Sequence, residues 1–167
     1  MHREPGARGA WPEEDGFTLL ELMMVILIIA IMIAVLMPTF MGATTRAKDR
    51  ATQASLTNAL QDAKDQFTAQ QGDYSAVTPA TLAGEERSLT FVASGANPSS
   101  ANTISVLQAP AGNTAQIILA SVSKSGTCFY VLDDETATAL YAQLPAAGGC
   151  QALGAPAPGA AAWQAKW

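Results

Sequence analysis

The chain has 167 residues, of which 49% are hydrophobic and 14% charged, and its formal net charge at pH 7 is −5. This length fits one domain with an appendage and leaves too little chain for a second sizeable core. The negative charge argues against a nucleic-acid-binding protein with a broad basic face, and no direct nucleic-acid site is evident.

An apolar run follows the first 16 residues, which contain Pro, Gly and charges without periodicity and are expected to be disordered. Residues 17–37 include only two polar side chains, those of Thr18 and Glu21. As a helix, this run would extend for about 32 Å, enough to cross a bilayer once. A cleaved secretory signal is the competing interpretation, but its apolar region is usually about 7–15 residues long. The sequence therefore predicts a transmembrane helix.

The helical pattern continues beyond the apolar run. Pro38 removes a backbone donor, which predicts a kink or a local unwinding. Residues 43–71 are rich in helix-forming residues, and Gly72 is a typical residue just past a helix end. The result is one helix of roughly 55 residues, far above the mean length of about 11–12. Apolar positions in its second half step mostly by three and four and predict an amphipathic stripe: Ala47, Ala51, Ala54, Leu56, Leu60, Ala63 and Phe67.

From residue 79 onward, short segments rich in Val, Ile, Phe and Tyr alternate with turn residues. Their short connections favour an antiparallel sheet, and the amphipathic stripe is the obvious partner for its apolar face. The expected fold is α+β, a long N-terminal helix packed on a small antiparallel β-sheet. Residues 151–167 are rich in Ala, Pro and Gly and are expected to form a flexible tail, where Trp163 and Trp167 are either contact points or exposed aromatics. The predicted strands are 88–93, 103–107, 116–123, 127–132 and 139–143.

The segment Gly16-Phe17-Thr18-Leu19-Leu20-Glu21 runs directly into the apolar helix. It resembles the cleavage and methylation segment of type IV prepilins and of the pseudopilins of type II secretion systems. The resemblance is close over residues 16 to about 40 and covers the helix-then-sheet layout loosely. It implies that prepilin peptidase cuts between Gly16 and Phe17 and that Phe17 is N-methylated. Pro38 matches a helix-breaking proline found at this distance in many pilins.

Glu21 stands inside the apolar run, where an ionised carboxylate costs about 2.5–3.5 kcal/mol. Cleavage after Gly16 would create a positive α-amine on Phe17, about one helical turn away, so pairing within one chain is open. The resemblance implies instead that Glu21 meets the amine of a neighbouring subunit and fixes the register of docking. If Glu21 has no function, its carboxylate would lie near the lipid headgroups, partly hydrated and protonated at little cost.

The resemblance implies a structural subunit of a type IV pilus-like filament. The alternatives are a type II secretion pseudopilin and, more remotely, a membrane-anchored extracytoplasmic domain with no filament role. The implied partners are other copies in a helical filament, prepilin peptidase, the pilus or secretion assembly platform, and membrane lipid before assembly. The chain would be a single-pass cytoplasmic membrane protein with an extracytoplasmic C-terminal domain, extracellular after assembly. Its expected parts are a leader (1–16), a transmembrane and filament-core helix (17–42), a globular pilin-like domain (43–150) and the tail (151–167).

The charges flanking the apolar run do not support this orientation by themselves. The leader contains Arg3 and Arg8 among four acidic residues, whereas Arg46, Lys48 and Arg50 follow the run. The positive-inside rule alone would place the leader outside, although acidic residues contribute little to that rule. The resemblance requires a cytoplasmic leader. We follow the motif over the charge rule and expect the leader in the cytoplasm.

Cys128 and Cys150 lack the further ligands of a zinc site and form either a disulfide or two free thiols. Many pilins close a C-terminal loop with a disulfide, so the resemblance favours the bond. Asp133 and Asp134 are weak calcium candidates, because consecutive carboxylates lack the alternate-residue spacing of an EF-hand loop. A solvated turn is the favoured interpretation, and neither a metal nor a cofactor is expected.

Catalytic patterns are missing from the sequence. The single histidine, His2, belongs to the leader, and no Gly-rich phosphate loop or paired carboxylates stand in a recognisable frame. The chain is therefore not expected to be an enzyme, and a membrane-anchored enzyme stays only as a further alternative.

Overall fold

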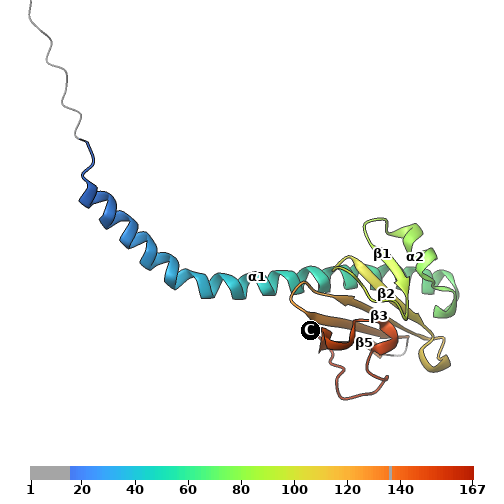
Figure 1. The fold of residues 1–167 in the computed structure, drawn as a ribbon. Coiled ribbons are helices and arrows are strands. Elements are labelled where there is room, and N and C mark those ends of the chain that lie inside the picture. The colour runs from blue at the N-terminus through green and yellow to red at the C-terminus, as the bar shows by residue number, and fades with distance from the viewer. Residues whose placement is uncertain (1–15, 136) are drawn as a thin grey trace, which may run out of the picture. The chain divides into compact units, whose positions relative to one another are not determined.

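The computed structural model describes residues 16–135 and 137–167, without the side chains of residues 38 and 39. The chain divides into two compact units, one ending at Met41 and the other comprising Gly42–Trp167. Helix α1 (Leu19–Ala69) contributes to both units and contains 51 residues (Figure 1). Its backbone is helical at Pro38, so the predicted local unwinding is not observed, while the predicted kink stays a prediction.

The C-terminal end of α1 depends on left-handed backbone. Gln71 and Gly72 have φ values of 60° and 88°, and the Gly72 amide donates to the Phe67 carbonyl at 2.9 Å. Glycine adopts this conformation without the steric cost of a Cβ atom, so it commonly follows a helix end. The helix stops at Ala69, three residues before the predicted terminating glycine.

The buried face of α1 differs from the predicted stripe. Ala47, Ala51 and Ala54 are exposed, whereas Thr52 and Ser55 are buried. The two hydroxyls donate to the carbonyls of Lys48 and Ala51, so each satisfies its polar group within the helix. Alanine is small enough for either environment and therefore marks a helix face poorly. The buried positions follow the helical repeat at Thr52, Ser55, Leu56, Ala59, Leu60 and Ala63.

Five strands form one sheet in the order β1-β2-β3-β4-β5, and all five predicted segments are strands. The predicted α+β fold is confirmed, with one difference in the sheet. β1 pairs with β2 in parallel, while the other three pairs are antiparallel. Because the two strands run in the same direction, residues 94–102 lead back to the end of the sheet at which β1 begins, and no tight hairpin joins the strands. The strand bounds are β1 (Thr90–Ala93), β2 (Thr103–Gln108), β3 (Gln116–Val122), β4 (Thr127–Asp134) and β5 (Ala137–Pro145).

A short helix, α2 (Pro79–Glu85), precedes β1 and was not predicted. The Thr81 amide donates to the Thr78 hydroxyl, and the Thr78 amide donates to the Thr81 hydroxyl. These bonds satisfy amides that a helix start leaves without partners, and proline is favoured at the first helical position. The Thr-Pro pair was the available sequence signal.

Both faces of the sheet are covered, whereas the sequence predicted one buried face. On the first face, Ile104, Leu119 and Val131 pack with Leu56 and Leu60 of α1 in one buried cluster. Each fully buried aliphatic side chain of this kind contributes roughly 1.5–3 kcal/mol. The second face carries another cluster, which joins the sheet to residues near the C-terminus: Ile118, Ala120, Cys128, Tyr130, Leu132, Ala142, Cys150, Ala152 and Trp163.

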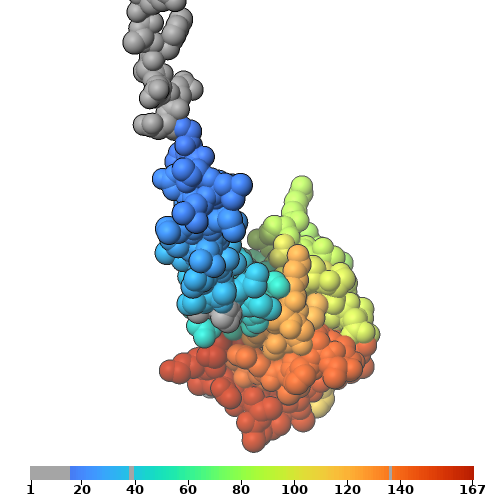
Figure 2. Space-filling model, turned by 60° about the vertical axis from the view of Figure 1, so that its left-hand side comes forward, coloured from blue at the N-terminus to red at the C-terminus, as the bar shows by residue number. Residues whose placement is uncertain are grey.

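The C-terminal segment, residues 151–167, packs on the sheet instead of forming the expected flexible tail (Figures 1 and 2). The Ala152 amide donates to the Ser105 hydroxyl at 3.0 Å, and Leu153 donates to the Ser94 carbonyl at 2.9 Å. Tyr141 of β5 exchanges two backbone hydrogen bonds of 2.8 Å with Gln164. Small side chains allow this backbone to approach the sheet closely. A low-complexity composition therefore did not prevent the segment from packing.

The two tryptophans of this segment are contact points on opposite faces. Trp163 belongs to the second-face cluster, and its indole N–H donates to the Ala157 carbonyl at 3.1 Å. Trp167 lies on the first face, with its ring centroid 4.6 Å from that of Tyr141 and 5.2 Å from that of Phe129. The segment thus passes around the outer edge of β5, where an uncovered strand could pair with another chain.

Candidate functional site: the processing and assembly segment

The predicted scissile bond lies just before α1 begins. Gly16, Phe17 and Thr18 have no regular secondary structure, and the Phe17 side chain is 83% exposed. Exposed chain outside regular structure is the usual substrate of a peptidase. The rest of the predicted leader, residues 1–15, lies outside the described residues.

Thr18 and Glu21 form a capping box at the start of α1. The amide and the hydroxyl of Thr18 each donate to Glu21 Oε2 at 3.2 Å, and the Glu21 amide donates to the Thr18 hydroxyl at 3.2 Å. The carboxylate also lies in the first helical turn, where the helix dipole favours a negative charge. The spacing Thr-x-x-Glu of residues 18–21 is the sequence signature of such a cap. In the isolated chain, Glu21 thus has a local partner.

The segment after this box exposes a continuous apolar surface. Leu19–Met37 has a mean hydropathy of 3.1, and none of it is buried. Among the described residues, it is the one helical stretch long and apolar enough to cross a membrane. Soluble monomers rarely expose apolar patches of more than a few hundred Å², so this surface requires lipid or other protein chains around it. The segment is consistent with a membrane-anchored protein.

Cys128 of β4 and Cys150 form a disulfide with a Cα–Cα distance of 5.2 Å. Both residues are buried in the second-face cluster. The Cys150 amide also donates to the side-chain oxygen of Asn97 at 3.1 Å. The bond anchors the start of the C-terminal segment to the beginning of β4. Of the two open interpretations, the structure shows the disulfide.

Asp133 and Asp134 contact separate protein groups and are not in a solvated turn. Asp133 is buried at an irregularity of the β4–β5 pairing, where Tyr74 donates to its Oδ2 atom at 2.6 Å. Lys64 Nζ lies 2.9 Å from its Oδ1 atom. Asp134 instead accepts a hydrogen bond from the side-chain Nε2 atom of Gln116. The two carboxylates are therefore not gathered around one point, and Asp133 joins α1 to the sheet.

The Tyr74 hydroxyl gives the folded protein a predictable response to alkaline pH. Burial, followed by its hydrogen bond to Asp133 and the nearby negative charges, raises the pKa of Tyr74 well above its ordinary range. The folded state therefore keeps a proton that the unfolded chain loses above about pH 10. The stability associated with this proton is present below that pH and declines as the pH rises.

We expect Tyr74→Phe to lower the free energy of unfolding at pH 7 by about 1.5–3 kcal/mol, because Asp133 loses a hydrogen bond. Above about pH 10 the variant should lose stability less steeply than the wild type. Part of the pH dependence should remain, because burial also raises the pKa of Tyr130. Urea unfolding of the detergent-solubilised chain at several pH values measures both effects. Tyr130→Phe is the matched control, since Tyr130 makes no side-chain hydrogen bond to the described residues, and an equal loss at pH 7 would contradict the assignment.

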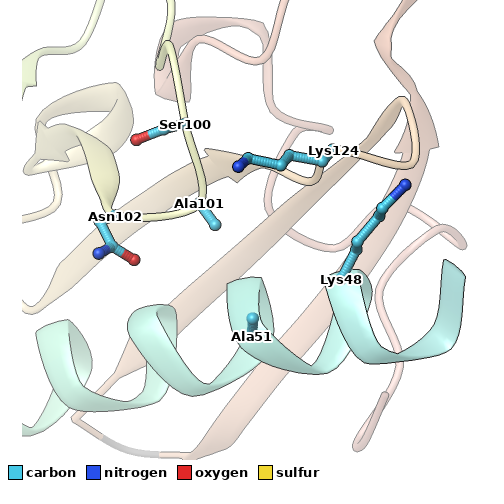
Figure 3. A pocket seen from close by; sticks show the side chains of 6 residues that line it. All are labelled: Lys48, Ala51, Ser100, Ala101, Asn102 and Lys124. Carbon is cyan, nitrogen blue, oxygen red and sulfur yellow. The ribbon is translucent and has the colours of Figure 1, made fainter. Parts of the chain in front are cut away.

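A hollow of about 260 Å³ opens beside α1 in the second unit (Figure 3). Lys48 and Ala51 of α1 form one side of it. Ala101, in the loop before β2, and Lys124, in the turn between β3 and β4, lie opposite. The same turn is tied to α1 because the hydroxyls of Ser123 and Ser125 both donate to Asp49. Two lysines distant in sequence are thereby held at one opening.

Comparison with known proteins identifies the N-terminal segment alone. Residues 13–37 match the model described as the prokaryotic N-terminal methylation motif. No curated protein and no solved structure matches the chain. The matched residues include the Gly16–Phe17 step, the capping box and the apolar helix up to Met37. The chain therefore carries the prepilin-type segment that is the signature of type IV pilins and pseudopilins.

Proposed function

We propose that the chain is a structural subunit of a type IV pilus-like filament and not an enzyme. Prepilin peptidase cuts after Gly16, and the processed chain waits in the membrane on its apolar helix before joining the filament. The observation that carries the proposal is the placement of Glu21. It is the single ionisable residue of the exposed run Leu19–Met37, within one turn of the predicted new amine on Phe17.

The capping box supports a change of partner during assembly. Before docking, the amide and hydroxyl of Thr18 stabilise the Glu21 carboxylate, which lowers the cost of keeping it at the membrane. The hydrogen bonds of 3.2 Å are long, and the carboxylate is exposed. The amine of a neighbouring Phe17 can therefore approach it and add an ion pair. A plain membrane anchor would need neither the scissile step nor this accessible charge.

Processing provides the direct test of the proposal. The filament or membrane form should have lost residues 1–16 and carry one methyl group on the amine of Phe17. Intact-mass measurement, followed by sequencing of the N-terminal peptide, detects both changes. Gly16→Leu is the matched variant and should remain uncleaved, because a bulky side chain replaces hydrogen at the scissile step. Assembled material that retains residues 1–16 would contradict the proposal.

A type II secretion pseudopilin remains the alternative, because it shares the same prepilin-type segment. Deleting the gene separates the two functions. Loss of surface filaments with normal export of secreted enzymes supports a pilus subunit. Intact surface pili with failed export supports a pseudopilin.

A further inference from the structure

Opposite charges are separated along one flank of α1 in the unit Gly42–Trp167. Lys48, Ala51, Ser55 and Asp62 follow one another at intervals of three, four and seven residues, which places them on the same flank. Lys48 and Asp62 are 14 residues apart in the helix, or about 21 Å along its axis. The flank thus has a basic end and an acidic end.

The basic end is the hollow described above, which we call the lysine socket (Lys48, Ala51, Ala101 and Lys124). Neither ammonium group forms an ion pair within the part of the chain that the structure describes. Ala51 and Ala101 leave open space between the lysines, so a side chain from outside can enter (Figure 3). The socket therefore offers two positive charges to an acidic partner.

The acidic end, which we call the carboxylate ridge, consists of Asp62 and Asp65 of α1 with Glu85 and Glu86 at the end of α2. Three of these residues, Asp62, Asp65 and Glu85, line a second, smaller hollow of about 150 Å³. Burial, then the charges of Glu86, Asp65 and Glu85, raise the pKa of Asp62. Its Oδ2 atom is buried without a hydrogen-bond partner among the described residues. The ridge therefore concentrates negative charge, and none of its carboxylates forms an ion pair within the described part of the chain.

We propose that, in the filament, the lysine socket of one copy receives the carboxylate ridge of another copy. This inference rests on the proposed function and names a second, electrostatic contact between subunits. Copies that insert in the same membrane have parallel helices, so socket and ridge meet only when one copy is displaced along the axis by about the 21 Å between Lys48 and Asp62. A contact between two different patches is heterologous and propagates into an open filament.

The complementarity favours a second copy over a lipid surface. Anionic headgroups would also bind Lys48 and Lys124, but they leave the carboxylate ridge without a partner. A second copy neutralises both patches at once, and each subunit repeats the contact with the next one. Charge pairs of this kind fix the relative position of partners and disfavour wrong registers.

The test uses two charge-reversed forms of the full chain. The socket form carries Lys48→Glu and Lys124→Glu, and the ridge form carries Asp65→Lys and Glu85→Lys. All four side chains are on the surface, so both forms should fold and form the Cys128–Cys150 disulfide. Each form alone should give at least about tenfold fewer pelletable filaments, because like charges then face each other. Lys166→Glu, an exposed reversal outside both patches, should assemble normally.

Co-expression of the two forms is the decisive arm. The acidic socket of one form then matches the basic ridge of the other, in both alternating contacts, so filaments should return to near wild-type yield. Wild-type yield from either form alone, or no recovery on co-expression of two folded forms, overturns the inference. Fewer filaments from the socket form, with normal assembly of the ridge form, would overturn the pairing and assign the lysines to lipid instead. Wild-type chain that never forms filaments would refute the proposed function itself.

Discussion

Glu21→Ala should insert into the membrane as well as the wild type, be cleaved after Gly16, and fail to assemble. Removing a carboxylate from an apolar run makes insertion easier. The scissile step is unchanged, so processing should continue. Assembly should fail because the amine of a neighbouring Phe17 would be buried without its carboxylate. Removing one partner of a buried pair costs about 3–5 kcal/mol, which corresponds to a loss of more than a hundredfold in docking.

Glu21→Gln is the sharper variant, since it preserves the size of the side chain and an oxygen acceptor for Thr18. The helix start should remain capped, while the ion pair with the neighbour is lost. Membrane fractionation measures insertion, intact mass measures cleavage, and ultracentrifugation of sheared material measures assembly. If Glu21→Ala and Glu21→Gln both form filaments at wild-type yield, charge pairing does not join the subunits.

Thr18→Val is the matched control on the same capping box. It removes the hydroxyl that bonds Glu21 but keeps the backbone amide and the carboxylate. Losing an N-terminal cap costs about 0.5–2 kcal/mol, less than leaving an amine unpaired. Thr18→Val should therefore assemble much better than Glu21→Gln. The reverse order would show that Glu21 acts chiefly as a helix cap.

Removing the disulfide should produce the largest loss of stability in the globular unit. For the double variant Cys128→Ser and Cys150→Ser, we expect the free energy of unfolding to fall by about 3 kcal/mol, the loop-entropy value for a loop of this length. The hydroxyls of serine would also enter a buried apolar cluster. Urea unfolding of the detergent-solubilised chain under non-reducing conditions measures the difference.

The loss should appear first in the C-terminal segment, because Cys150 is its covalent attachment to β4. Trp163 and Trp167 both lie in this segment, so their fluorescence should change before the circular dichroism signal of α1 and the sheet. Alkylation of the native wild-type chain should label neither cysteine. An unchanged urea midpoint in the double variant would show that noncovalent contacts alone retain the segment.

Local patterns in the sequence determined the element types and the processing segment. The apolar run, the Gly16–Phe17 step and Glu21 are contiguous in the chain, so their spacing is visible without any tertiary information. The strands were also predictable, because β1 to β4 are rich in β-branched and aromatic residues and turn signals separate the segments. The short helix α2 was missed although Thr78 and Pro79 mark its start and Ala, Leu and Glu follow them, because seven residues are too few to show a helical period.

Only the tertiary structure decided which groups meet across the sequence. The buried face of α1 depends on how the helix lies on the sheet. This packing buries Thr52 and Ser55 and leaves Ala47 and Ala51 exposed. The sequence predicts a solvated turn at Asp133. In the structure this residue accepts a hydrogen bond from Tyr74, 59 positions away. The parallel β1–β2 pair, the packed C-terminal segment and the lysine socket likewise join distant residues. Such contacts form because they bury apolar surface or satisfy polar groups in the folded chain. The periodicity of a local segment does not contain the free energy that these distant contacts contribute.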